Sequence, residues 1–166
     1  MFDRSNTVIA IAGPTAVGKT KFAIMLAQAF DGEVVSCDSM QLYKYMDIGS
    51  AKPTPEELSM AKHHLVDMID PRDEFSVAQY QKLAKTAIKD ILSRGKTPII
   101  SGGTGLYLNS LIYDMDFSSV PEDNSYRSEL EAIAEQEGGR ETLHKRLAEL
   151  DPKAASLIHP NNAKKV

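Results

Sequence analysis

Short runs of apolar residues alternate with longer amphipathic stretches along the first ~113 residues of the chain. Four of the runs have the length and β-branched content of strands: residues 7–12, 33–37, 64–69 and 97–100. Thr7–Ala12 is apolar nearly throughout and ends at a Gly-Pro pair, which is typical of a parallel strand buried on both faces. We therefore expect this strand near the centre of a parallel sheet.

The stretches between these strands predict helices. Residues 19–30 are apolar on nearly all sides, so we expect a helix packed on the sheet. Residues 54–57 (Thr-Pro-Glu-Glu) have the composition of a capping box and predict the start of a short helix. Ser76 opens another helix with apolar residues at helical spacing, and Gly95 ends it. A last helix is expected over 106–113.

Beyond residue 113 the strand pattern stops. Two weaker amphipathic helices follow, and Asp151-Pro152 can start a third. Their apolar stripes are Tyr126, Leu130 and Ile133 in the first helix and Leu143, Leu147 and Leu150 in the second. Because alternating strands and helices form parallel sheets, the sequence predicts an α/β core with helices on both faces over residues 1–113. Residues 114–166 are expected to form a helical segment.

Composition and charge limit the class of protein and the cellular compartment that we expect. The 166 residues are 42% hydrophobic and 25% charged, as in ordinary globular proteins, and no apolar run approaches the ~20 residues of a membrane helix. No secretory signal is apparent, and the single cysteine, Cys37, suits a reducing cytoplasm. The net charge of −4 argues against general nucleic-acid binding but leaves room for a local RNA site.

The first strand runs into a P-loop of the pattern G-x-x-x-x-G-K-T, with a buried strand before it and a helix after it. The glycines let backbone amides converge on phosphate oxygens at a helix N-terminus. The lysine adds a cation, and the last threonine can ligate Mg²⁺. The motif predicts a P-loop NTPase-like core that binds a di- or triphosphate through Gly13, Pro14, Thr15, Ala16, Val17, Gly18, Lys19 and Thr20.

Asp38 directly follows the second strand, at the sheet edge where ligands gather in open parallel sheets. Its carboxylate can act as a general base on a substrate N–H or O–H. A helix N-cap or a ligand of metal-bound water are the alternatives. Ser39, Gln41 and Tyr43 on the same connection have the character of ordinary loop residues.

The last predicted strand leads into Ser101-Gly102-Gly103-Thr104-Gly105, where glycines allow a close approach of the backbone to a ligand. No acidic residue follows Ile100, although many P-loop NTPases hold Mg²⁺ through such an acid, and this weakens an ATPase or GTPase interpretation. His63 and His64 are adjacent and point apart, so a loop or capping role is favoured over a metal pair. Cys37 is expected in the core, and Lys164-Lys165 as solvated charge.

Four blocks follow one another along the chain: GPTAVGKT at 13–20, DSMQLY at 38–43, MDIGSAKP at 46–53 and GGTGLY at 102–107. Together they resemble the tRNA dimethylallyltransferase family. HHL at 63–65 and IHPNN at 158–162 also look like stretches of that family. The resemblance covers almost the whole chain and is far more specific than the P-loop alone.

The resemblance implies an enzyme that transfers a dimethylallyl group from dimethylallyl diphosphate to N6 of the adenosine 3′ of the anticodon in tRNA. The adenine would leave its stack to reach the pocket. Thr15–Thr20 would hold the diphosphate with Mg²⁺ near Thr20, and Asp38 would accept the amine proton. Contacts with the tRNA anticodon stem-loop would come from Asp38, Ser39, Met40, Gln41, Thr104, Tyr126, Lys164 and Lys165.

Members of this family are about twice as long, so the resemblance also implies an N-terminal fragment, with a catalytic arginine and further core strands beyond Val166. The full-length protein is expected to be a cytoplasmic monomer. The alternative is a small-molecule kinase with a shikimate-kinase-like layout. The Gly-Pro-Thr-Ala loop and the helical segment after Asp114 disfavour that alternative.

Overall fold

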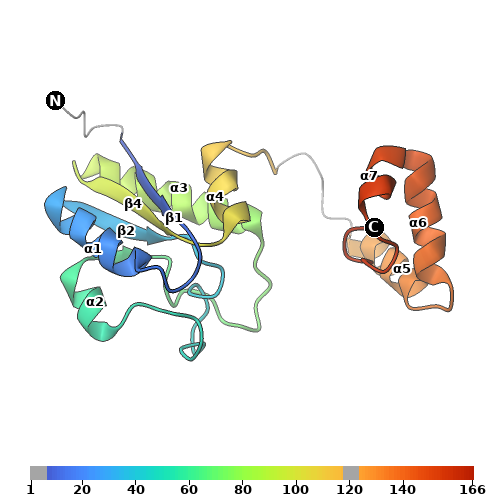
Figure 1. Cartoon of the computed structure of the whole chain (residues 1–166), viewed down its shortest axis with the longest axis horizontal. Coiled ribbons are helices and arrows are strands. Elements are labelled where there is room, and N and C mark those ends of the chain that lie inside the picture. The colour runs from blue at the N-terminus through green and yellow to red at the C-terminus, as the bar shows by residue number, and fades with distance from the viewer. Residues whose placement is uncertain (1–6, 118–123) are drawn as a thin grey trace. The chain divides into compact units, whose positions relative to one another are not determined.

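The computed structural model describes residues 7–117 and 124–166. The chain divides into two compact units, an α/β unit up to Phe117 and a helical unit from Ser118 (Figure 1). The division falls at 117 rather than after the expected residue 113. Contacts attach the intervening residues to the α/β unit. Among them, Lys85 forms an ion pair with Asp114, and Gln81 Nε2 donates to the Met115 carbonyl at 2.9 Å.

The α/β unit is built on a four-stranded parallel sheet. Its strands are β1 (Ile9–Ala12), β2 (Gly32–Ser36), β3 (His63–His64) and β4 (Thr97–Gly102), in the order β1-β4-β2-β3. Ile9 of β1 lies beside Ile99 of β4, and Val34 of β2 lies on the other side of Ile99. The predicted fold class, a parallel α/β sheet of the P-loop NTPase type, is confirmed.

The predicted central position of the first strand is wrong, because β1 is an edge strand and β4 lies inside the sheet between β1 and β2. The predicted burial on both faces is wrong for the same reason. Ile9 and Ile11 pack against the core, whereas Ala10 and Ala12 are exposed. The apolar run indicated a strand but carried no information on its neighbours.

Helices cover both faces of the sheet, as predicted (Figure 1). Helix α1 (Lys19–Ala29) buries Ala23 and Ala27 against Val34 and Ile99. Helix α3 (Val77–Ser93) and helix α4 (Gly105–Ile112) pack on the opposite face over a second apolar cluster. In that cluster the rings of Tyr80 and Tyr107 stack with centroids 4.0 Å apart, and Cys37 is buried as expected.

Two helices begin where their capping boxes predicted. The Thr54 side chain accepts from Glu57 N at the start of α2 (Pro55–Met60), and the Glu57 carboxylate accepts in return from Thr54 N. Ser76 and Gln79 form the same reciprocal pair at the start of α3. Each box satisfies two backbone donors that a helix start leaves without partners, which is why so short a sequence pattern is informative.

The predicted strand over residues 64–69 is mostly wrong, because β3 contains only His63 and His64. Leu65 and Asp67 have positive φ angles of 62° and 54°, a conformation that cannot continue a strand. The chain makes a single bridge further on, between Tyr43 and Ile69. The two imidazoles do point apart, as expected, since His63 Nδ1 meets the Ala61 carbonyl and His64 Nε2 meets Glu33 Oε2.

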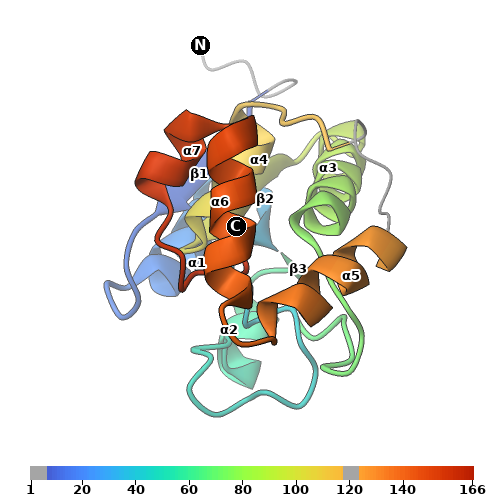
Figure 2. The ribbon, with the colours of Figure 1, turned by 90° about the vertical axis from the view of Figure 1, so that its right-hand side faces the viewer.

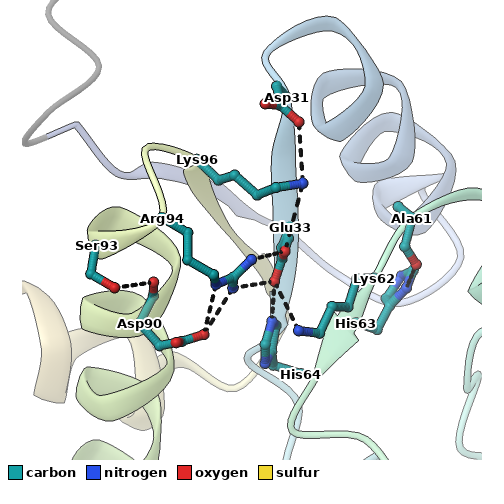
Figure 3. A network of polar contacts seen from close by, with 10 residues as sticks. All are labelled: Asp31, Glu33, Ala61, Lys62, His63, His64, Asp90, Ser93, Arg94 and Lys96. Atoms are coloured by element: carbon teal, nitrogen blue, oxygen red, sulfur yellow. Dashed lines mark hydrogen bonds and ion pairs between the residues drawn. The ribbon is translucent and has the colours of Figure 1, made fainter.

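A buried carboxylate ties β2, β3 and α3 together (Figure 3). The Glu33 side chain is 4% exposed, and Arg94 donates to both of its oxygens, to Oε2 at 2.7 Å. His64 Nε2 lies 2.7 Å from Glu33 Oε2, and Lys62 and Lys96 lie at 3.5 and 3.8 Å. The hydrogen bond from Arg94 outweighs desolvation and, together with the His64 hydrogen bond and the Lys62 charge, lowers the Glu33 pKa to about 2.

The helical unit contains α5 (Asn124–Ala134), α6 (Gly139–Leu150) and α7 (Pro152–Leu157), all three predicted. Figure 2 shows α6 between the other two helices. His144 on α6 approaches the Ile158 carbonyl with Nε2 at 2.8 Å, and Leu143 and Ala155 are buried. In the described parts of the chain, no helix is long and apolar enough to cross a membrane.

Candidate functional site

The P-loop occupies the turn between β1 and α1, as the motif predicted. Gly18 has a φ of 85° and Ala16 a φ of 68°, so the loop turns sharply before the helix begins at Lys19. The first backbone N–H groups of a helix have no partner within the helix, and here they face the loop. The Lys19 ammonium folds back to donate to the Pro14 carbonyl at 2.6 Å. A sharp turn that leads into a helix start, with a lysine beside it, is an arrangement suited to phosphate oxygens.

The connection that carries Asp38 is held against the glycine-rich end of β4. The Thr104 hydroxyl accepts from Ser39 N at 2.9 Å, and Thr104 N donates to the Cys37 carbonyl at 3.2 Å. Asp38 Oδ1 accepts from Met40 N at 2.9 Å, which closes a turn. No helix starts there, so the N-cap alternative for Asp38 is wrong. Among the described residues, Asp38 Oδ2 receives no hydrogen bond and is available to a ligand.

One cavity of about 310 Å³ joins the P-loop to Asp38. This volume is within the range of small-molecule sites. Two lysines, Lys19 and Lys21, line it beside α1, and Asp38 and Glu57 add carboxylates. Its other lining residues are Thr15, Ala16, Gly18, Thr20, Val34, Ser36, Gln41, Ala51, Pro53, His63, Ser101 and Gly102. A phosphate-binding end and a carboxylate therefore share one space.

Gln41 lies in this cavity with its side-chain amide held at both atoms. Its Nε2 donates to the Ala51 carbonyl at 2.8 Å, and its Oε1 accepts from the Ser36 hydroxyl at 2.9 Å. A primary amide has two N–H donors and two oxygen lone pairs. Each end of the Gln41 amide thus keeps one donor or one lone pair for a ligand.

His63 also lines the cavity and was not predicted as a site residue. Its Nδ1 is 2.8 Å from the Ala61 carbonyl, which can only accept, so Nδ1 carries the proton. Burial lowers the His63 pKa, although the Ala61 bond and the Glu57 charge oppose that effect. Nε2 is buried, and within the described residues it has no partner. The neutral ring contributes an acceptor and no positive charge for phosphate.

The glycine cluster after β4 serves the fold at least as much as a ligand. A Cβ on Gly102 would lie 2.0 Å from the Cys37 carbonyl oxygen, and one on Gly103 would lie 3.1 Å from the Gly13 oxygen. Gly102 is therefore needed because the ends of β2 and β4 approach so closely. The sequence interpretation, close approach to a ligand, missed this contact between strands.

The other predicted site residues do not share this cavity. Gly13, Pro14 and Thr104 line a second cavity of about 150 Å³ beside α4, and Ser39 is held by Thr104. The Val17 and Met40 side chains are exposed. In the helical unit Tyr126 and Lys164 line a groove of about 540 Å³ between α5 and α6, and Lys165 is exposed. These residues remain predictions.

A comparison with known protein families now adds to this geometry. The family described as IPP transferase matches residues 41–166. The chain belongs to the IPP transferase family. The resemblance inferred from four motif blocks is thereby confirmed, and the shikimate-kinase-like alternative is not favoured.

Individual relatives agree with this family membership. A tRNA dimethylallyltransferase of Exiguobacterium sp. strain AT1b is 58% identical over 163 residues, which are 98% of this chain and 52% of that protein. A tRNA dimethylallyltransferase of Acetivibrio thermocellus is 55% identical over 161 residues, which are 97% of this chain and 51% of the relative. The chain thus spans about half the length of the curated relatives it matches.

Solved structures match both the fold and the sequence. The full-length tRNA isopentenylpyrophosphate transferase of Bacillus halodurans superposes with a TM-score of 0.67 at 50% identity, over 96% of this chain and 52% of that one. A eukaryotic dimethylallyltransferase captured acting on tRNA has a TM-score of 0.76 at 35% identity, over 95% of this chain and 39% of that one.

Proposed function

We propose that this chain supplies the diphosphate-binding and base-handling part of a tRNA dimethylallyltransferase. The reaction transfers a dimethylallyl group from dimethylallyl diphosphate to N6 of the adenosine 3′ of the anticodon and releases diphosphate. The observation that carries the proposal is the cavity in which Lys19 and Thr20 share one space with Asp38. The named relatives support the same activity.

In this proposal each end of the cavity has its own role. The P-loop amides and Lys19 bind the diphosphate and stabilise the negative charge that grows on it as the C1–O bond breaks. The lone pair of the adenine N6 amine forms the new bond to C1 of the dimethylallyl group. One proton of that amine passes to Asp38 Oδ2. The amine is a weak nucleophile because its lone pair is delocalised into the ring, so a positioned base accelerates the step.

The lining fits a magnesium ion that is bound together with the diphosphate. Mg²⁺ prefers oxygen ligands and often combines one or two protein oxygens with substrate phosphates. The Thr20 hydroxyl supplies such an oxygen on this cavity, beside the P-loop. The ion would neutralise charge on the leaving diphosphate. We place the reaction in the cytoplasm, with the full-length protein acting as a monomer on the tRNA anticodon stem-loop.

A chimaeric enzyme tests the proposal. Residues 1–166 of this chain replace the matching half of the Exiguobacterium relative, which is 58% identical over 163 residues. The chimaera is incubated with Mg²⁺, labelled dimethylallyl diphosphate and an anticodon stem-loop RNA. We expect label on the RNA, and none on an RNA with guanosine at the target position.

A parallel reaction with ATP and a set of small alcohols distinguishes a small-molecule kinase from the proposed prenyltransferase. ATP turnover without any prenyl transfer would refute the proposal, because the same P-loop would then serve phosphoryl transfer. Calorimetry on the 166-residue chain with dimethylallyl diphosphate, pyrophosphate and ATP ranks the ligands directly. We expect the allylic diphosphate and pyrophosphate to bind with Mg²⁺.

A further inference from the structure

A buried lysine stands just behind the cavity wall and takes no part in the proposed chemistry. The Lys52 side chain is 7% exposed, and its ammonium lies 2.8 Å from Asp47 Oδ1 and 2.5 Å from Asp67 Oδ1. Burial alone would lower the Lys52 pKa, but the bonds to Asp47 and Asp67 outweigh it and raise the pKa. The lysine therefore stays charged and joins two connections, residues 45–53 and 65–68.

The connection that Lys52 anchors is in an unfavourable backbone conformation. Ala51 has a φ of 50°, and Asp67, at the other end of the ion pair, has a φ of 54°. Non-glycine residues reach this left-handed region at a cost of roughly 1–2 kcal/mol, so they persist there only when the surrounding structure holds them. Lys52 directly follows Ala51, and its two ion pairs restrain the backbone next to Ala51.

The Ala51 carbonyl decides which way the Gln41 amide points. The carbonyl can only accept, so it must face the Gln41 nitrogen, 2.8 Å away. The Ser36 hydroxyl on the other side could donate or accept and would tolerate either orientation. Because Ala51 fixes the amide, Gln41 presents one N–H and one oxygen lone pair to the cavity that contains Asp38.

A fixed donor and acceptor side by side match one purine edge. A glutamine amide pairs with adenine by accepting from N6 and donating to N7. Guanine carries an O6 acceptor in place of the N6 amine, which would oppose the Gln41 oxygen. The second N6 proton remains free for Asp38.

We propose that Lys52 is a positioning residue which, through the Ala51 carbonyl, sets the Gln41 amide so that the site accepts adenine and rejects guanine. This inference rests on the proposed function. Lys52 would contact no substrate itself but would affect the choice between adenine and guanine.

The test has one readout that needs no activity. In ¹H–¹⁵N spectra of the 166-residue chain, the Gln41 side-chain proton that is bonded to the Ala51 carbonyl is expected to lie away from its position in a solvated glutamine. Gln41→Leu removes both side-chain signals and so identifies them. Lys52→Met should move both signals toward those of a solvated glutamine, whereas Lys52→Arg should keep them. Asp67→Asn removes one ion pair and should give a smaller change, which serves the test if Lys52→Met does not fold. Lys89→Met, at an exposed position on α3, is the matched control.

The second readout is base choice by the chimaera, measured as the ratio of kcat/KM for stem-loops with adenosine or guanosine at the target position. A well-placed pair of hydrogen bonds discriminates between bases by roughly 5-fold to 100-fold. Lys52→Met should reduce the ratio at least ~5-fold, and Lys52→Arg should restore it. Unchanged Gln41 signals, or an unchanged ratio despite moved signals, would overturn the inference. A chimaera that transfers to neither RNA counts against the proposed function, and the Gln41 signals then decide alone whether Lys52 positions the amide.

Discussion

Replacing Glu33 by glutamine tests the buried network of the α/β unit. Glu33→Gln keeps the shape and one acceptor but removes the charge that Arg94, His64, Lys62 and Lys96 surround (Figure 3). Folding lowers the Glu33 pKa from 4.5 to about 2, chiefly through the hydrogen bond from Arg94. At 1.36 kcal/mol for each pKa unit, the charge contributes about 3 kcal/mol to the free energy of unfolding. Solvent around the partly exposed Arg94 reduces this to about 2–3 kcal/mol.

The direction in which the Glu33 contribution to stability changes with pH follows from its lowered pKa. The carboxyl of the unfolded chain protonates near its ordinary pKa of 4.5, whereas that of the folded chain stays ionised down to about 2. The contribution is therefore complete above the unfolded pKa and is lost as the pH falls through this window. We expect Glu33→Gln to be less stable at neutral pH and to approach the wild type as the pH nears the bottom of the window.

Urea unfolding followed by far-UV circular dichroism measures the difference at a series of pH values. Asp70→Asn is the control, because Arg72 also lowers the Asp70 pKa to about 2 but this pair lies at the surface. Solvent screens such pairs, so we expect little change. Equal stabilities of Glu33→Gln and wild type at neutral pH would refute the reasoning. A difference that persists unchanged in acid would refute it as well.

Three further outcomes are expected. Lys19→Ala should weaken binding of dimethylallyl diphosphate at least ~10-fold in calorimetry, since charge-assisted hydrogen bonds contribute about 1.5–3 kcal/mol. An unchanged affinity would show that Lys19 does not bind the diphosphate. In the chimaera, Asp38→Asn should slow single-turnover transfer ~10²–10⁴-fold with diphosphate affinity and melting temperature preserved, and a drop of less than ~5-fold would place the base elsewhere. In the described sheet β1 has a neighbour on one side only, and this edge should make the 166-residue chain self-associate in analytical ultracentrifugation. Ala10→Lys should suppress the association, and a monomeric wild type would contradict the prediction.

Local patterns determined much of this protein in advance. The P-loop and the capping boxes at Thr54 and Ser76 were readable because every group involved lies within a few residues of its partner. Apolar periodicity located nearly all helices for the same reason. Family membership was readable too, since several short blocks kept their order along the chain.

The order of the strands was decided by the tertiary structure alone. The run over residues 7–12 is as apolar as a central strand, yet β4 takes the inner position and leaves β1 at the edge. The strand expected over residues 64–69 stops early because Leu65 and Asp67 adopt positive φ angles within the connection that Lys52 anchors. Composition does not show either constraint, because each arises from neighbours that are distant in sequence.

For the candidate site too, the sequence indicated some features and the tertiary structure decided the others. The sequence indicated the two groups that we propose for the chemistry, Lys19 and Asp38, because their motifs are local. It could not show that the Ala51 carbonyl orients Gln41, or that Arg94 reaches Glu33 across 61 positions of the chain. Hydrogen bonds and ion pairs of this kind depend on angles and on distances of about 3 Å. Only the packed chain sets these, so the fold alone decided how the chemical groups are held.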